Sequence, residues 1–172
     1  MKRYEFGSST LTLERLKTLL HYDPETGLWT WRVNKGRVKA GSIAGCSTRG
    51  YWVLRVDQHN YLSHILAWFY MTGEWPEHEV DHRDLDKGNN HWDNLRPATD
   101  VQQEWNKPPS KARPNTQTGF VGVYQTKGTI YARIQTNGER EYMGPFSTFE
   151  EAALAREKRA RELRGEFYRG TL

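Results

Sequence analysis

EVDHRDLDKGNNHWDNLRPATDVQQEWNK, residues 79–107, is the stretch that decides the fold. Its first four residues predict a strand, and a loop rich in Gly and Asn follows at 87–90. A second strand is predicted at 92–96, and the polar residues 100–107 predict a helix. The order strand, loop, strand, helix predicts a small α+β unit in this part of the chain.

An aspartate and a histidine stand side by side at the end of the first predicted strand. The carboxylate of Asp81 can hold a hard divalent cation while the imidazole of His82 activates a water molecule. Asn94 follows His82 by twelve residues, and the predicted helix offers Gln103 and Asn106. The pair alone is more typical of a polar surface loop, so the hydrolytic interpretation depends on the whole run.

That run, VDH…GNN…DNLRPAT, resembles the HNH endonuclease family, whose core is two strands and a helix around one divalent metal ion. The resemblance covers about residues 12–107, because HYDPETG at 21–27 and LSHILAW at 62–68 are similar to segments that precede the core in many phage-borne members. It implies a ββα-metal nuclease domain over residues 1–107, with its core at 79–107.

The resemblance also implies a role for each matching residue. Asp81 is expected to bind the metal, and His82 is expected to be the general base that deprotonates the attacking water. Asn94 is expected to bridge the loop and help orient the histidine. Gln103 stands where His or Asn is usual in the family, and it is expected to be the second metal ligand, with Asn106 as the fallback. Carboxylate, carboxamide and phosphate ligands suit Mg²⁺ or Mn²⁺.

The residues before this core predict further elements of mixed type. Residues 12–21 predict a short helix, 28–33 and 51–57 predict strands, and 63–72 predict a buried helix that Gly73 ends. His64 lies within the buried helix, and we interpret it as a packed histidine rather than a ligand. The loop between the two strands carries basic residues that are candidate phosphate contacts: Lys35, Arg37, Lys39 and Arg49.

A second module follows a linker. Residues 107–114 contain three prolines and cannot continue a helix, so 108–114 is the predicted linker. Beyond it, 119–125, 129–136 and 140–146 predict strands, and a capping box at 148–151 opens a helix that runs to about residue 163. The fold class is therefore α+β, with a three-stranded antiparallel sheet packed on one helix in residues 115–172.

Residues 115–168 resemble the AP2 DNA-binding domain through GFVGVY, YARI, YMGPF and TFEEAA, in that order. The family lays its sheet in the major groove, with the helix behind. Because side chains alternate along a strand, Arg133 and Gln135 are predicted to face away from the helix side of the sheet. With Arg140, and with Lys111 and Arg113 of the linker, they are the predicted DNA contacts.

Charge separates the two modules. Of 25 Lys and Arg in the 172 residues, 11 lie from Pro108 onward against 7 of the 21 Asp and Glu, so the net charge of +4 belongs to the C-terminal part. Such a basic module favours a nucleic-acid partner. One cysteine excludes an internal disulfide and a zinc finger, and the chain has no apolar run near the ~20 residues of a membrane span.

Together these features predict a site-directed, divalent-metal-dependent endonuclease of the phage homing type that hydrolyses duplex DNA, one strand per active site. We expect no small-molecule substrate, no membrane partner, no required oligomer and a cytoplasmic location, that of the host if the protein is phage-encoded. Two alternatives stay open. One is a catalytically weakened HNH protein that binds DNA sequence-specifically; the other is an RNA-directed or structure-specific nuclease with the same core.

Overall fold

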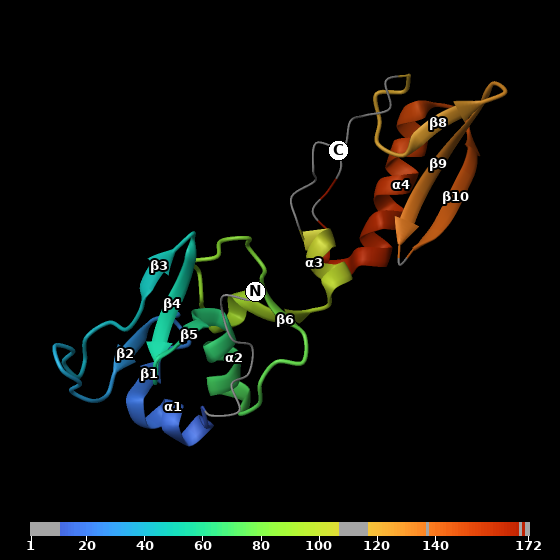
Figure 1. Cartoon of the computed structure of the whole chain (residues 1–172). Coiled ribbons are helices and arrows are strands. Elements are labelled where there is room, and N and C mark those ends of the chain that lie inside the picture. Colours follow the sequence, from blue (N-terminus) through green and yellow to red (C-terminus); the bar gives the residue numbers. More distant parts are fainter. Residues whose placement is uncertain (1–10, 107–116, 137, 169, 171–172) are drawn as a thin grey trace. The chain divides into compact units, whose positions relative to one another are not determined.

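A computed structural model describes residues 11–106, 117–136, 138–168 and 170 (Figure 1). The chain divides into two compact units, residues 1–99 and 100–172. The division lies ahead of the predicted linker, so the helix that follows Thr99 counts with the second unit. Lys111 and Arg113, predicted as DNA contacts, lie outside the described residues. Within the described ranges, no helix is long and apolar enough to cross a membrane.

The first unit consists of three small antiparallel sheets around two helices. Its elements, in chain order, are α1 (Leu13–Leu19), β1 (Leu20–Tyr22), β2 (Trp29–Trp31), β3 (Cys46–Thr48), β4 (Tyr51–Val56), β5 (His59–Leu62), α2 (Ser63–Thr72), β6 (Glu79–His82), the 3-10 turn η1 (Trp92–Asn94) and β7 (Leu95–Ala98). The sheets are β1–β2, β3–β4–β5 and β6–β7. This confirms the mixed α+β character that the sequence predicts.

Helix α2 lies at the centre of this unit, in contact with α1 and with strands β4, β5 and β6 (Figure 1). It spans the predicted residues 63–72, and Gly73 ends it with a left-handed φ of 85°. Its buried side chains share one core with Trp29 and Leu54, both fully buried. The indole Nε1–H of Trp29 donates to Ser63 Oγ at 3.0 Å. The buried indole nitrogen therefore has a hydrogen-bond partner.

Two predicted elements of the first unit change their type over part of their length. The helix predicted at 12–21 ends at Leu19, because Leu20 turns to extended backbone and pairs with Trp31. The strand predicted at 92–96 begins only at Leu95, since Trp92–Asn94 forms a 3-10 turn. In both places tertiary pairing overrides the local periodicity.

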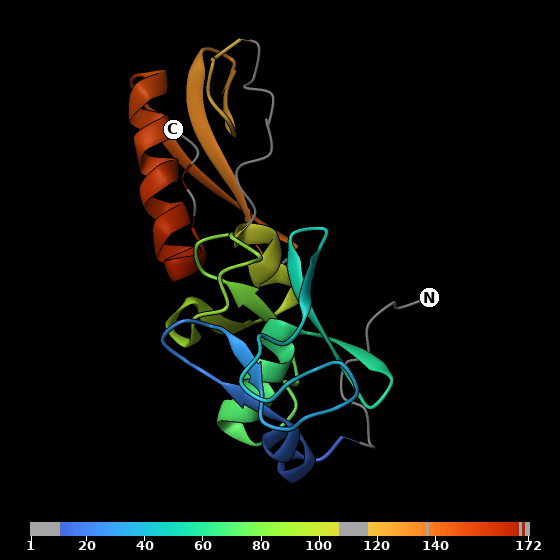
Figure 2. The ribbon, with the colours of Figure 1, turned by 90° about the vertical axis from the view of Figure 1, so that its left-hand side faces the viewer.

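The second unit begins with α3 (Asp100–Asn106) and continues with β8 (Val123–Thr126), β9 (Thr129–Thr136), β10 (Glu139–Phe146), α4 (Phe149–Arg164) and the 3-10 turn η2 (Gly165–Phe167). The strands form an antiparallel sheet in the order β10–β9–β8, and α4 packs along one face of it (Figure 2). Small side chains, Ala132 on β9 and Ala152 and Ala153 on α4, allow this close approach.

Candidate active site

Strands β6 and β7 form the frame that holds the predicted catalytic pair. They are antiparallel, with Asp81 opposite Arg96 and His82 opposite Leu95. The backbone N–H of Arg83 then donates to the carbonyl of Asn94 at 2.8 Å, which closes the loop between the strands at its base. Asp81 and His82 therefore stand where a paired strand meets a closed loop.

The loop is held by hydrogen bonds among its own polar side chains. Asn94 Nδ2 donates to Asp84 Oδ1 at 2.9 Å and to the carbonyl of Asn89 at 2.8 Å, while Asn89 Nδ2 donates to Asp84 Oδ2 at 2.6 Å. Burial opposes ionisation of Asp84, but the hydrogen bonds from Asn89, Asn94 and the backbone of Asp86 together lower its pKa. Asn94 thus bridges the loop, as its position in the motif predicts.

The imidazole of His82 is buried, with 5% of its surface exposed. Its Nε2 lies 3.3 Å from Asn90 Oδ1. Asn90 Nδ2 donates to the carbonyl of Gly88 at 2.9 Å, and a carbonyl only accepts, so the amide orientation is fixed with Oδ1 toward the histidine. The Nε2–H of His82 is then the donor, which places the lone pair of the neutral ring on Nδ1.

Burial is the largest influence on His82 and lowers its pKa, against the opposing effects of the Asn90 hydrogen bond and of three nearby carboxylates. A lowered pKa keeps the ring neutral near pH 7. Neutral imidazole is the form that accepts a proton. The site thus supplies a base with a defined tautomer.

Asn90 itself is fixed from a distant part of the sequence. Tyr22 Oη donates to the carbonyl of Asn90 at 2.6 Å, in a buried contact between residues 68 apart. Burial, followed by the charges of Asp23 and Asp93, raises the pKa of Tyr22 well above its ordinary value, so the phenol keeps the proton that it donates. Nothing in the local sequence pattern distinguishes Asn90 from the asparagine before it. Its side-chain amide reaches His82 only because the first unit folds as it does.

The turn at residues 23–27 lies directly against the loop. The backbone N–H of Trp92 donates to the carbonyl of Pro24 at 2.9 Å. Gly27 has a left-handed φ of 68°, and a Cβ there would come within 2.4 Å of the carbonyl carbon of Asn90. Only glycine fits both conditions. The HYDPETG segment therefore packs directly against the loop between β6 and β7.

A second buried histidine packs against the first. The ring centroids of His64 and His82 are 4.8 Å apart in an edge-on arrangement, and Tyr51 lies 5.6 Å from the former and 6.4 Å from the latter. Burial, followed by the charge of His82, lowers the pKa of His64 to about 3. Among the described residues, nothing hydrogen-bonds its Nδ1. These contacts agree with the interpretation of His64 as a packed histidine.

Asp81 is paired with a buried arginine. Arg96 Nη2 lies 3.2 Å and Nε 3.3 Å from Asp81 Oδ2, and only 2% of Arg96 is exposed. The Asp81 side chain keeps 16% of its surface exposed. The carboxylate thus has a fixed direction set by its cross-strand neighbour.

The two other predicted metal ligands lie on α3, in the second unit. Gln103 is half-buried there, and Asn106 is the last residue of the helix. Across the described residues, no group of three or more His, Cys, Asp or Glu side chains gathers as a metal site. The roles of Asp81, Gln103 and Asn106 in metal binding stay predictions.

The sheet of the second unit has one covered face and one open face. Ala132 and Ile134 are buried toward α4, whereas Arg133 and Gln135 between and beyond them are exposed, as the alternation predicts. Arg140 is also exposed and pairs with Gln135 across the strands. The three predicted DNA contacts of this sheet therefore stand together on one face.

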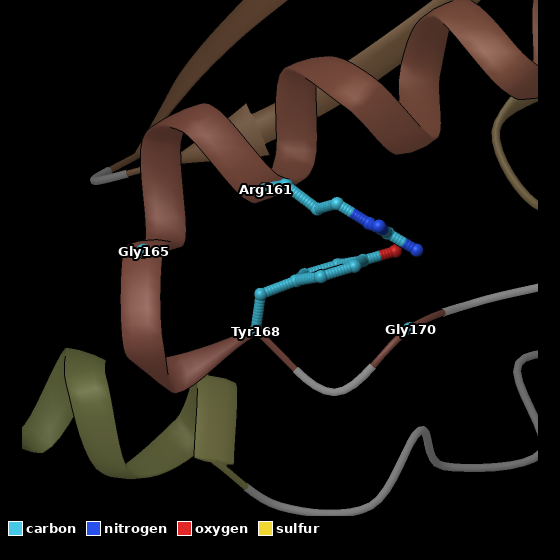
Figure 3. Close-up of a pocket in the computed structure, with 4 residues that line it drawn as sticks. All are labelled: Arg161, Gly165, Tyr168 and Gly170. Carbon is cyan, nitrogen blue, oxygen red and sulfur yellow. The ribbon is translucent and has the colours of Figure 1, made fainter.

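A polar cavity of about 530 Å³ lies at the C-terminal end of α4, lined by Arg161, Gly165, Tyr168 and Gly170 (Figure 3). The phenol of Tyr168 hydrogen-bonds Glu157, and Arg161 pairs with the same carboxylate at 3.4 Å. These polar groups serve one another, so the cavity adds nothing to the catalytic site.

Comparison with known proteins identifies one domain. Residues 61–104, from β5 into α3, match the family model of the HNH endonucleases. No curated protein and no solved structure matches the chain. The matched segment carries Asp81 and His82 on their predicted strand, and Asn94 in the 3-10 turn just before β7. The protein is therefore an enzyme, a DNA endonuclease, of a kind that generally uses a divalent metal ion.

Proposed function

We propose that the protein is a site-directed endonuclease of the phage homing type that hydrolyses phosphodiester bonds in duplex DNA and cuts one strand per active site. The observation that carries the proposal is the geometry of His82. It is buried, held by Asn90 in one tautomer, and placed one residue from a carboxylate. Acid–base chemistry on a water molecule needs such a fixed, neutral imidazole.

In this mechanism Nδ1 of His82 accepts the proton of the attacking water. The hydrogen bond from Nε2–H to Asn90 becomes stronger as the ring gains charge, because the amide oxygen then accepts from a cation. The carbonyl of Gly88 keeps that amide oriented, and Tyr22 holds the backbone of Asn90 through its carbonyl. General-base assistance of this kind contributes about 10²–10⁴-fold in rate.

The residue types proposed as ligands fit a hard divalent ion. Asp81, next to His82, would supply a carboxylate, and Gln103 or Asn106 of the second unit would supply a carboxamide oxygen, the ligand types that Mg²⁺ and Mn²⁺ prefer. When bound, such an ion stabilises the negative charge that develops on the scissile phosphate and the leaving oxygen. Arg96 holds the Asp81 carboxylate in its direction through Oδ2.

The second unit supplies position on the DNA in this proposal. Its three-stranded sheet and packed helix have the order of elements that the AP2-like interpretation requires. Arg133, Gln135 and Arg140 stand on the open face, where Arg can pair with guanine and Gln with adenine. A nuclease core that engages phosphates carries no sequence information itself, so a separate surface that recognises bases is needed.

The direct test uses supercoiled plasmid as the substrate, with Mg²⁺, with Mn²⁺ and with chelator. The wild type is expected to convert plasmid to the nicked form only with metal, and Asp81→Ala is expected to lose that conversion. Gln103→Asn tests how far a longer carboxamide side chain weakens the site. Cutting that persists in chelator, or in Asp81→Ala, would refute the metal-dependent proposal.

One observation favours a second candidate, a sequence-specific DNA-binding protein with a weakened nuclease core. Asp81 is already paired with Arg96 through one oxygen, and Gln103 replaces the usual His or Asn. If the wild type binds duplex DNA without cutting it, and the Gln103→Asn variant does cut, the second candidate is correct. Competition between duplex DNA and RNA in the same assay separates the RNA-directed alternative.

A further inference from the structure

Two exposed cations lie on neighbouring segments, Arg49 on the turn between β3 and β4 and Lys87 on the loop between β6 and β7. Arg49 and Gly50 form the two-residue turn between β3 and β4, and the side chain of Lys87 lies next to that turn, its Cδ within 3.8 Å of the position a Cβ on Gly50 would take. Gly88 would place a Cβ 3.9 Å from the Gly50 carbonyl. The hairpin tip and the catalytic loop are therefore neighbours. We call Arg49 and Lys87 the rim pair.

The position of Lys87 is set by an aromatic ring. Its Nζ lies 4.8 Å from the centroid of Tyr51, a distance at which the ring attracts the ammonium group. The same ring lies 6.4 Å from that of His82. The ammonium is thus at most about 11 Å, the sum of these two distances, from the predicted base. Phosphates of one strand rise ~3.4 Å per nucleotide along the helix axis, so the ammonium lies within reach of a phosphate close to the one that His82 would act on.

Arg49 occupies a backbone conformation that its residue type disfavours. Its φ is 54° and that of Gly50 is 84°. Positive φ at both central residues is what a type I′ hairpin turn requires. Asn, Asp or Gly suits the first position of such a turn, since a larger side chain is strained there. Arg49 is therefore not required by the turn, so Arg49→Asn removes its charge without a cost to the hairpin.

Neither cation of the rim pair is neutralised within the described residues. Arg15 and Lys35 of the same unit both pair with Asp57, whereas Arg49 and Lys87 have no ion pair in the ranges that the structure describes. The carboxylates nearest in sequence, Asp84 and Asp86, accept hydrogen bonds inside the loop, Asp86 from the backbone of Gly88 at 2.8 Å. Both cations therefore stay open to a ligand outside the described residues.

We propose that the rim pair binds the phosphate backbone of the DNA strand next to the scissile phosphate, and that Tyr51 positions Lys87 for this contact. The inference rests on the proposed function and names a substrate contact beyond the catalytic and sheet residues. Because phosphate contacts are independent of sequence, any duplex serves as the probe.

The first measurement is the salt dependence of binding of the full chain to a 30-base-pair duplex, in chelator so that nothing is cut. Removal of one phosphate-binding cation is expected to reduce the slope of log K against log salt by about 0.9. Lys87→Gln and Arg49→Asn should each show this reduction. Arg49→Asn should also leave the melting temperature unchanged or raise it. If Arg49 were merely structural, its replacement would lower the melting temperature instead.

Lys17 provides the matched control, since it is an exposed lysine of the same unit whose Nζ lies 5.0 Å from the ring of Tyr70. Lys17→Gln should leave the slope unchanged. Acetylation of lysines by an activated ester, read by mass spectrometry, gives a second measurement. Duplex DNA should protect Lys87 and leave Lys17 as reactive as before.

The proposal is overturned if Lys87 is acetylated equally with and without duplex DNA and both rim variants keep the wild-type slope. It is also overturned if duplex RNA protects Lys87 and duplex DNA does not. The binding measurements contain no metal, so they are independent of cutting. If DNA protects Lys87 and both variants show the reduced slope, but the wild type never nicks plasmid, only the nuclease proposal is refuted.

Discussion

Two buried imidazoles, His64 and His82, lie in contact, with ring centroids 4.8 Å apart. Burial lowers the pKa of each, so both rings are neutral at pH 7. The second ring excludes water from one side of His82 without adding charge. The predicted base therefore meets solvent and substrate from a limited direction, which favours proton transfer at one ring nitrogen.

Replacement of the base or its partner tests the tautomer directly. His82→Ala is expected to reduce plasmid nicking by about 10²–10⁴-fold. Asn90→Ala should reduce it by about tenfold, since about 1.4 kcal/mol of a hydrogen bond to the reacting group is removed. Initial nicking rates with Mg²⁺ provide the measurement, and DNA affinity in chelator should be unchanged. His82→Ala that nicks at the wild-type rate would remove His82 from the mechanism.

The buried His64 predicts acid sensitivity of the fold. Its pKa is about 3 in the folded protein against about 6.5 unfolded, so between these values the unfolded chain binds the extra proton. Stability therefore falls as pH drops below 6.5, by about 1.4 kcal/mol per pH unit for this group. Urea unfolding between pH 7 and 5 should show a shallower pH slope for His64→Gln.

His91, an exposed histidine, supplies the control for that experiment. His91→Gln should keep the wild-type pH slope of the unfolding free energy. Equal slopes for the wild type and His64→Gln would show that His64 titrates as an ordinary histidine.

At this scale, sequence reasoning identified residues whose role depends on near neighbours. Asn94 bonds to Asp84 and Asn89, ten and five residues away, and the resemblance to the HNH motif already implied a bridge across the loop there. Asn90 depends on Tyr22, 68 residues earlier, and no local pattern indicates such a partner. Arg96 was likewise missed, because strand register alone places it beside Asp81.

Among the elements, the turn at 23–27 has the clearest influence on the site. Asp23 holds it by accepting from Glu25 N at 3.0 Å and from Thr26 Oγ1 at 2.8 Å. Those hydrogen bonds lower the pKa of Asp23, Thr26 being the main cause. A stable turn keeps Pro24 and Gly27 against the loop that carries Asn90.

Gly27→Ala tests this contact, with Gly36→Ala as its matched control. Both glycines have left-handed φ values, 68° and 61°, so both variants lose about 1–2 kcal/mol from backbone strain. Only at Gly27 would the new Cβ meet other atoms within 4 Å, which adds about 1–3 kcal/mol. Denaturant midpoints measure the difference. Nicking should fall in Gly27→Ala alone; equal effects on midpoint and nicking would remove the turn from the site.

The elements that sequence predicted best are those that local patterns define. Helix α2 has its predicted bounds because its apolar residues and the terminating Gly73 agree. Helix α4 begins as its capping signal predicts, with Thr148 accepting from Glu151 N at 3.0 Å. Leu20 and His21 were predicted as the end of a helix, since their pairing with β2 becomes visible only in the folded unit.

For the whole molecule, two units with different charge divide the work in the proposed function. The charge difference along the sequence already indicates two modules, and the structure divides the chain at residues 99 and 100. The division places Gln103 in the second unit, on α3. Sequence spacing alone could not assign that helix to a unit, because it depends on contacts with η2 at the far end of the chain.

Arg133→Ala should separate the two tasks. The side chain stands on the open face of the sheet, so its removal is expected to weaken binding by about 1–3 kcal/mol if it contacts a base, while the turnover of bound DNA is unchanged. Plasmid nicking at several DNA concentrations should show a higher KM with the same kcat.

Arg159→Ala is the control for that variant, because Arg159 on α4 pairs with Glu141 at 2.8 Å and with Glu162 at 3.2 Å. Its replacement should leave KM unchanged. If Arg133→Ala also leaves KM unchanged, the open face is not the surface that recognises bases.

The close approach of Gly27 to Asn90 limits how this nuclease can be recombined with other proteins. The family match begins at residue 61, yet the carbonyl that Tyr22 fixes and the backbone that Gly27 touches both belong to the matched segment. A chimera that contains residues 61–104 alone would lack the contacts that Tyr22 and Gly27 make with the backbone of Asn90. The smallest unit that can be exchanged as a working part therefore starts upstream of Tyr22, and gene fusions designed at the family boundary should fail for that reason.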